Sequence, residues 1–240
     1  MSRPIDRVIT WSEDKPPVSA RCYRAADETP ARAVLLLAHG AGAGFTHPFM
    51  VTFGERLSAL GIDVVTFNFP YMEAGRRLPD PAPLLESCYL GVLADVRRWE
   101  NLGAHTVFLG GKSLGGRMAS HVAAFHAERA GPLGGVVLLG YPLHPPGRPH
   151  QRRDAHLGAI AVPMLFVQGS RDGFGTPDEL RPVLASLRAR ADLAIVDGGD
   201  HSFVVPRSHG MSQEQVLASA ADRIARWIQA VSRSGSTCFG

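Results

Sequence analysis

Short apolar runs alternate with longer amphipathic segments along almost the whole chain. Six of the runs are nearly continuous in apolar residues, which is the pattern of strands buried on both faces of a parallel sheet. The predicted strands are Ala33–Ala38, Asp63–Phe67, Thr106–Leu109, Val136–Leu139, Met164–Val167 and Leu193–Val196. The predicted helices are about Pro48–Leu60, Leu84–Leu102, Leu114–Arg129, Pro177–Arg188 and Ser212–Val231. This alternation predicts an α/β fold, a doubly wound and mostly parallel sheet with helices on both faces and right-handed crossovers.

The two ends of the chain carry weaker signals. Arg7–Thr10 and Val18–Tyr23 indicate an antiparallel hairpin at one edge of the sheet. Residues 232–240 are mostly small and polar, and we expect them to form a flexible tail. Because no repeat or linker divides the chain, we expect a single domain over residues 1–240, with its core at about residues 30–231.

Composition and charge narrow the classes of function. The 240 residues are 45% hydrophobic and 20% charged, a balance typical of a globular domain. The net charge of +3 is small and evenly spread, so we expect neither nucleic acid nor a membrane surface as a partner. No apolar run approaches the roughly 20 residues that cross a bilayer, and the start of the chain lacks an apolar signal segment. The three cysteines, Cys22, Cys88 and Cys238, are widely spaced and are expected to be free thiols. Because thiols stay reduced in the cytosol, the sequence predicts a cytoplasmic protein.

The segment after the strand Thr106–Leu109 carries the strongest chemical signal. Gly111, Ser113 and Gly115 match the G-x-S-x-G pattern of a nucleophile elbow, with a strand before it and a helical segment after it. So tight a turn holds the serine at positive φ and leaves no room for side chains beside it, which explains the glycines. The turn would lift the Ser113 hydroxyl clear of the sheet and place it at a helix N-terminus.

A serine hydroxyl needs a base to become a nucleophile, and the base needs an orienting carboxylate. Asp172 follows the strand Met164–Val167, and His201 follows Leu193–Val196. The carboxyl ends of parallel strands share one edge of the sheet, so both are predicted to reach Ser113 there. Asp197 and Asp200 are rivals for the carboxylate, but they share the loop of His201, where reaching its Nδ1 is harder. Asp200 is expected to shape that turn instead.

A loop of small residues, beginning at His39, follows the strand Ala33–Ala38. Backbone N–H groups can approach a substrate oxygen closely here, so the predicted oxyanion hole takes one donor from Ala41 and one from Leu114. The spacing matches neither glycine-rich phosphate loop, and the histidines lack metal-ligand spacing. We therefore expect no cofactor and no metal.

Two long connections are candidate walls of the pocket because they follow strand ends: Asn68–Pro83 and Tyr141–Arg153. Aromatic residues that follow strand ends, expected to line an apolar acyl site, are Phe45, Phe69, Tyr71 and Tyr141. No segment is long and apolar enough to form a full lid, so we expect a shallow site for short acyl groups. Lys112 could contact an anionic substrate, but a side chain at this position often packs away from the pocket, so a structural role is expected. Arg117 is expected to pair with an acidic residue beneath the site, and the sequence leaves open whether either side chain touches substrate.

The motifs HGAGAG, GGKSLGG, GSRD and GGDHSF, in this order and spacing, resemble those of the α/β-hydrolase superfamily. They are most similar to its small dienelactone-hydrolase-like branch, which includes the testis-expressed hydrolase-like proteins and a domain of a histone-acetyltransferase complex subunit. The resemblance covers about residues 30–230 and implies a sheet of about seven to eight strands with Ser113, Asp172 and His201 as the triad. Unlike dienelactone hydrolase, the chain carries serine rather than cysteine at the nucleophile position, which puts that enzyme's lactone chemistry in doubt.

Two functions fit these residues. The first is a serine hydrolase that cleaves small-molecule esters or thioesters through an acyl-Ser113 intermediate. The second is an interaction module of the same fold with a vestigial triad; the intact triad positions argue modestly against it. The acyl group, the leaving group and the oligomeric state stay open.

Overall fold

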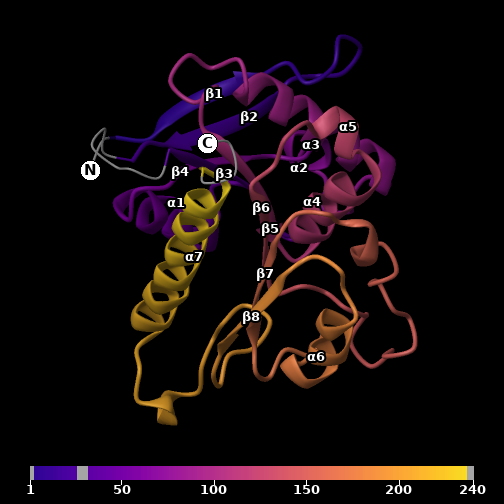
Figure 1. The fold of residues 1–240 in the computed structure, drawn as a ribbon. Coiled ribbons are helices and arrows are strands. Elements are labelled where there is room, and N and C mark those ends of the chain that lie inside the picture. The colour runs from indigo at the N-terminus through magenta and orange to yellow at the C-terminus, as the bar shows by residue number, and fades with distance from the viewer. Residues whose placement is uncertain (1–2, 26–31, 237–240) are drawn as a thin grey trace.

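The computed structural model describes residues 3–25 and 32–236, with side chains through Arg233. This part of the chain contains one eight-stranded sheet, in the order β1-β2-β4-β3-β5-β6-β7-β8 (Figure 1). The strands are β1 (Ile5–Ile9), β2 (Val18–Tyr23), β3 (Ala33–Ala38), β4 (Asp63–Phe67), β5 (Thr106–Lys112), β6 (Gly135–Leu139), β7 (Met164–Gly169) and β8 (Ala191–Val196). Strands β3 to β8 are parallel to one another, while β1 and β2 run antiparallel at one edge.

The sequence predicted this sheet closely. All six buried strands and the N-terminal hairpin are observed, and the fold class is confirmed. Strand β5 is longer than expected because Gly110, Gly111 and Lys112 continue to pair with Val137, Leu138 and Leu139 of β6. The pairing carries β5 right up to Ser113, so the nucleophile candidate is anchored directly on the central part of the sheet.

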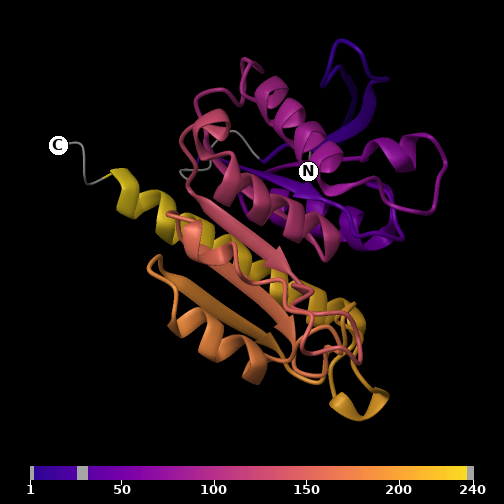
Figure 2. The same cartoon turned by 90° about the vertical axis from the view of Figure 1, so that its right-hand side faces the viewer.

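Helices cover both faces of the sheet. The helices are α1 (Pro48–Ala59), α2 (Pro70–Glu73), α3 (Ala82–Val96), α4 (Leu114–Phe125), α5 (Ala127–Ala130), α6 (Pro177–Ala185) and α7 (Gln213–Ser236), with short 3-10 turns at Leu157–Ala159 and Arg207–His209. Apolar residues of α1 and α7 pack with one face of the sheet, and those of α3, α4 and α6 pack with the other. Figure 2 shows α7 along one face and α4 and α6 on the opposite side. The burial of both faces explains the continuous apolar strands.

Several helix boundaries differ from the prediction. Helix α3 ends at Val96, where Arg97 turns back to donate hydrogen bonds to the carbonyls of Ala130 and Pro132. The helix expected to continue to Arg129 is interrupted at His126, whose ring pairs with Glu86 of α3. These long-range polar contacts override a helical pattern that is local to the sequence.

The C-terminal helix also differs from the prediction. Helix α7 extends to Ser236, so the first part of the predicted tail is helical, and residues 237–240 lie outside the described residues. Cys22 and Cys88 are free and buried, as expected, and burial raises the pKa of the Cys22 thiol to about 11. Cys238 lies outside the described residues.

No large lid covers the sheet edge. Between β6 and β7, where a cap could be inserted, the only helical element in the described chain is the single turn Leu157–Ala159. The other long connection, Asn68–Pro83, contains the short helix α2, which the sequence did not predict. The carboxyl ends of the parallel strands are therefore open to solvent over part of their width.

Candidate active site

Ser113 stands in a sharp turn between β5 and α4. Its backbone has φ 51° and ψ −110°, a conformation that a residue other than glycine rarely adopts. A Cβ atom on Gly111 would overlap the backbone of Gly115, and one on Gly115 would overlap the backbone of Ala38. The glycines are therefore required by close backbone packing, and the turn presents the Ser113 hydroxyl at the carboxyl edge of the sheet.

The structure brings Ser113, His201 and Asp172 together from the ends of three strands. The Nε2 atom of His201 lies 2.9 Å from the Ser113 Oγ. On the other side of the ring, Nδ1 lies 2.8 Å from Oδ2 and 3.0 Å from Oδ1 of Asp172. Asp172 is fully buried, whereas the His201 side chain keeps 21% of its exposure. This is the geometry of a serine nucleophile, a base and an orienting acid.

Buried donors fix the Asp172 carboxylate. Gln168 donates its side-chain amide to Oδ2 at 2.9 Å, and the Phe174 backbone N–H donates to Oδ1 at 2.8 Å. Gln168 is itself fully buried and held by the Tyr141 N–H and the Gly175 carbonyl. Sequence reasoning missed Gln168, although it stands four residues before Asp172 within the same strand-to-loop segment.

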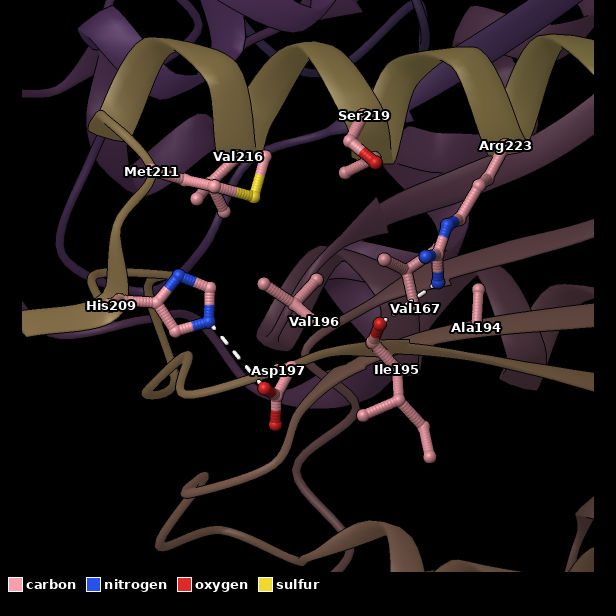
Figure 3. A pocket seen from close by; sticks show the side chains of 11 residues that line it. Val167, Ala194, Ile195, Val196, Asp197, His209, Met211, Val216, Ser219 and Arg223 are labelled. Atoms are coloured by element: carbon pink, nitrogen blue, oxygen red, sulfur yellow. Dashed lines mark hydrogen bonds and ion pairs between the residues drawn. The ribbon is translucent and has the colours of Figure 1, made fainter. Parts of the chain in front are cut away.

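The rival acids are engaged elsewhere. Asp200 accepts hydrogen bonds from the backbone N–H groups of Ser202 and Val204, so it shapes the turn that carries His201. Asp197 lies 3.5 Å from Nε2 of His209 at a separate pocket of about 100 Å³ between β8 and α7 (Figure 3). In Figure 3 the Asp197 carboxylate points toward His209. Neither acid has a hydrogen bond to His201 among the described residues.

Buried side chains support the small-residue loop after β3. His39 Nδ1 donates to the Gly40 carbonyl at 2.7 Å, and its Nε2 accepts the Phe69 N–H at 3.0 Å, which places the ring proton on Nδ1. Burial lowers the pKa of His39 to about 4, so the ring is neutral near pH 7. The Tyr71 hydroxyl donates to the Ala41 carbonyl at 2.9 Å. These contacts hold Ala41 beside Ser113, while Leu114 is the first residue of α4.

A pocket of about 370 Å³ opens at Ser113 and His201. Its lining residues are Gly40, Ala41, Gly42, Ala43, His47, Phe49, Met50, Lys112, Ser113, Phe174, His201 and Ser202. The apolar walls come from Phe49 and Met50 of α1 and from Phe174, whose ring stacks on His201 with centroids 4.1 Å apart. The pocket is at the small end of the range for ligand sites.

The expected aromatic walls require a correction. Phe45, Phe69, Tyr71 and Tyr141 are all buried and lie outside the lining of this pocket. Phe69 packs against Phe67 in the core, and the Tyr141 hydroxyl donates to the Arg153 carbonyl. Aromatic side chains gain more by burial in the core than by facing water at the loops, so these residues shape the loops from behind.

The pocket aromatic residues that sequence reasoning missed are Phe49 and Phe174. Phe49 is near the start of α1, which points at the same sheet edge as the strand ends, and Phe174 follows Asp172 by two residues. Both residues stand in segments that follow strand ends, and this position was the sequence signal that could have identified them as pocket residues. Arg117 does not line the pocket and has no ion pair in the described chain, so the expected pairing beneath the site is absent there.

A model of the α/β hydrolase domain matches residues 31–229, most of the chain. The chain belongs to the α/β-hydrolase family. This agrees with the sheet order, the turn at Ser113 and the three strand-end side chains. Within the described residues of this α/β hydrolase, no cluster of His, Cys, Asp and Glu side chains is placed to hold a metal ion. Nor does any described helix combine the length and apolar character needed to cross a bilayer.

Solved structures show the same fold. A serine hydrolase homologue from Coxiella burnetii is 17% identical, with a TM-score of 0.71 over 92% of this chain and 96% of that one. The dienelactone hydrolase from Anabaena variabilis is 21% identical, with a TM-score of 0.72 over 95% and 99% of the two chains. A serine hydrolase without a lid from Xanthomonas campestris is 18% identical, with a TM-score of 0.69 over 95% and 96%. These likenesses extend to the whole architecture of this α/β hydrolase.

Proposed function

We propose that this α/β hydrolase is a serine hydrolase that cleaves small carboxylic esters or thioesters through an acyl-Ser113 intermediate. The observation that carries the proposal is the continuous hydrogen-bonded chain from Ser113 through His201 to the buried Asp172. Ser113, at the end of this series of hydrogen bonds, lines a partly apolar pocket. The names of the structural neighbours, which include serine hydrolase homologues and an esterase domain, agree with hydrolysis.

In the proposed mechanism, Ser113 Oγ attacks the substrate carbonyl carbon while His201 Nε2 takes the hydroxyl proton. The developing oxyanion accepts hydrogen bonds from the backbone N–H groups of Ala41 and Leu114. Asp172 stabilises the imidazolium and keeps the proton on Nδ1. When the intermediate collapses, the bond to the leaving group breaks and His201 gives that group its proton. A water molecule, deprotonated by His201, then attacks the acyl carbon. As the bond between that carbon and Ser113 Oγ breaks, His201 returns the proton to Oγ, which releases the acid and free Ser113.

A fluorophosphonate probe tests the proposal directly, because it phosphonylates an activated serine and loses fluoride. We expect stoichiometric labelling that peptide mass mapping assigns to Ser113. Ser186 is exposed at the end of α6 and provides a matched control, since Ser186→Ala should label like the wild type. An unlabelled, folded protein would instead favour the interaction module as the function.

The pocket predicts a preference for short acyl chains. Each CH₂ group buried adds about 0.8 kcal/mol of binding, but only while apolar wall remains for it to contact. Here the apolar walls are limited to Phe49, Met50 and Phe174, and no large lid extends them. In a series of 4-nitrophenyl esters, kcat/KM should peak at short acyl chains and stop rising at about C6, where the wall ends. Rates still rising at C10 or C12 would reveal a deep acyl tunnel and contradict this prediction.

A further inference from the structure

Lys112 is the last residue of β5 and immediately precedes Ser113. Its side chain was expected to pack away from the site, yet Lys112 lines the pocket while retaining only 9% of its exposure. The chain has one other lysine, Lys15, whose side chain is 45% exposed far away in sequence. A buried lysine beside the nucleophile is therefore an exceptional feature of this chain.

The side chain of Lys112 runs from beside the glycine loop to Gly140, next to the triad histidine. Its Cγ is 3.6 Å from the point where a Cβ on Gly40 would stand. Its Nζ is 2.9 Å from the corresponding point on Gly140, and His201 Nδ1 is 3.4 Å from that same point. The Nζ atom also lies 5.9 Å from the centre of the Phe49 ring. Gly40, Phe49 and His201 all line the pocket, but Nζ itself is buried from solvent, so the ammonium lies behind the pocket wall.

No described residue pairs with this ammonium group. Nζ has no hydrogen-bond partner and no ion pair within residues 3–25 and 32–236. Asp172 and Asp200 attract the ammonium through space, but their oxygens already accept hydrogen bonds from other groups. Burial lowers the pKa of Lys112 to about 8, which reflects the cost of keeping the charge there. A buried charge without a partner is unfavourable unless a ligand supplies one.

The described pocket lining itself supplies no carboxylate to pair with this charge. Among the described lining residues there is no aspartate or glutamate, and no other lysine or arginine. A single ammonium group beside apolar walls therefore matches a ligand with one negative charge and an apolar chain. Because the lysine stem is flexible and carries three donors, the ammonium can turn toward an anion without movement of the backbone.

We propose that Lys112 binds a carboxylate on the substrate, so that the enzyme hydrolyses esters that carry a second, free carboxylate in preference to neutral ones. The inference rests on the proposed hydrolase function, whose substrate class it names. A carboxylate paired with Lys112 gains a charge-assisted hydrogen bond from an ammonium group that has no other partner among the described residues. It also offsets the repulsion between the ammonium and the imidazolium that forms on His201 during catalysis.

Matched pairs of esters test the proposal. One pair places the charge on the acyl half, mono(4-nitrophenyl) glutarate against 4-nitrophenyl pentanoate. The other places it on the leaving group, 4-acetoxybenzoate against its methyl ester. We expect the charged member of at least one pair to have a kcat/KM higher by roughly 10- to 100-fold in the wild type, mainly through KM. The pair that responds identifies the half of the substrate that faces Lys112.

The variant Lys112→Met should remove this preference, because it keeps the stem but not the charge. The quantity compared is the ratio of kcat/KM for the charged ester to kcat/KM for the neutral ester. Because the two esters have the same intrinsic reactivities with either protein, a change in this ratio between wild type and variant reports the loss of the charge on residue 112. Lys15→Met is the matched control and should keep the wild-type ratio. Lys112→Gln provides a second neutral variant if the methionine variant does not fold. A wild-type ratio near one, or a ratio that survives the loss of Lys112, would overturn the proposal.

A binding measurement separates this inference from the proposed hydrolysis. In a Ser113→Ala background, calorimetry should detect monomethyl glutarate, and the additional change Lys112→Met should abolish that binding. If binding depends on Lys112 but the wild-type protein turns over no ester, the carboxylate site is kept and the hydrolase function is rejected. Turnover of both members of each pair at equal rates would keep the hydrolase function and reject the carboxylate site.

Discussion

Replacing Ser113 with alanine is expected to lower kcat for 4-nitrophenyl acetate by roughly 10⁴- to 10⁶-fold, because the acyl intermediate can no longer form. The hydroxyl is the only group lost, and the side chain of its hydrogen-bond partner, His201, is partly exposed to water. The strained backbone at residue 113 stays as it was, since alanine and serine have the same Cβ atom. We therefore expect the fold to survive.

Steady-state rates measured with the purified variant check this expectation, and circular dichroism with thermal unfolding checks the fold. A contaminating esterase is excluded when the same preparation no longer reacts with the fluorophosphonate probe. A pure, folded Ser113→Ala protein with nearly the wild-type rate would remove Ser113 from the mechanism.

Replacing Asp172 with asparagine should cost on the order of 10⁴-fold in kcat, because an amide favours the wrong tautomer of the imidazole. The structure adds a second reason. Both carboxylate oxygens of Asp172 accept hydrogen bonds, from Gln168 and from the Phe174 N–H, as well as from His201. An asparagine NH₂ group would face one of these donors and lose that contact, which disturbs the position of His201.

Asp200→Asn is the matched comparison for this prediction, since Asp200 is in the same region but its carboxylate accepts hydrogen bonds only from backbone N–H groups in the described chain. Its effect on kcat should be far smaller, and rates for the two variants, measured side by side, give the ranking. If Asp200→Asn proved the more damaging change, the orienting acid would have to be reassigned to Asp200.

The sequence alone determined the layers of this protein and the order of its chemical groups. Strands buried on both faces must be apolar throughout, so the strand runs were visible without a structure. The tight turn at Ser113 requires Gly111 and Gly115, and both glycines are within two residues of Ser113, so this requirement is visible in the sequence. Parallel strands deliver the loops that follow them to a common edge, which is why Asp172 and His201 could be placed near Ser113 from their positions after strands.

Only the tertiary structure decided which side chains form the pocket. The periodicity of a sequence says that Phe69, Tyr71 and Phe49 are apolar, but not which of them turns into the core. Phe69 and Tyr71 turn inward beneath the glycine loop, whereas Phe49 projects from α1 into the pocket.

The environment of Lys112 likewise depended on tertiary structure. Its stem passes Gly40 of the β3 loop, and its ammonium group lies beside Gly140 after β6 and 5.9 Å from the centre of the Phe49 ring of α1, three segments that are distant in sequence. All of these neighbours together bury Nζ and leave it without a hydrogen-bond partner among the described residues. No single segment of the chain encodes them, because each neighbour is contributed by a different part of the fold.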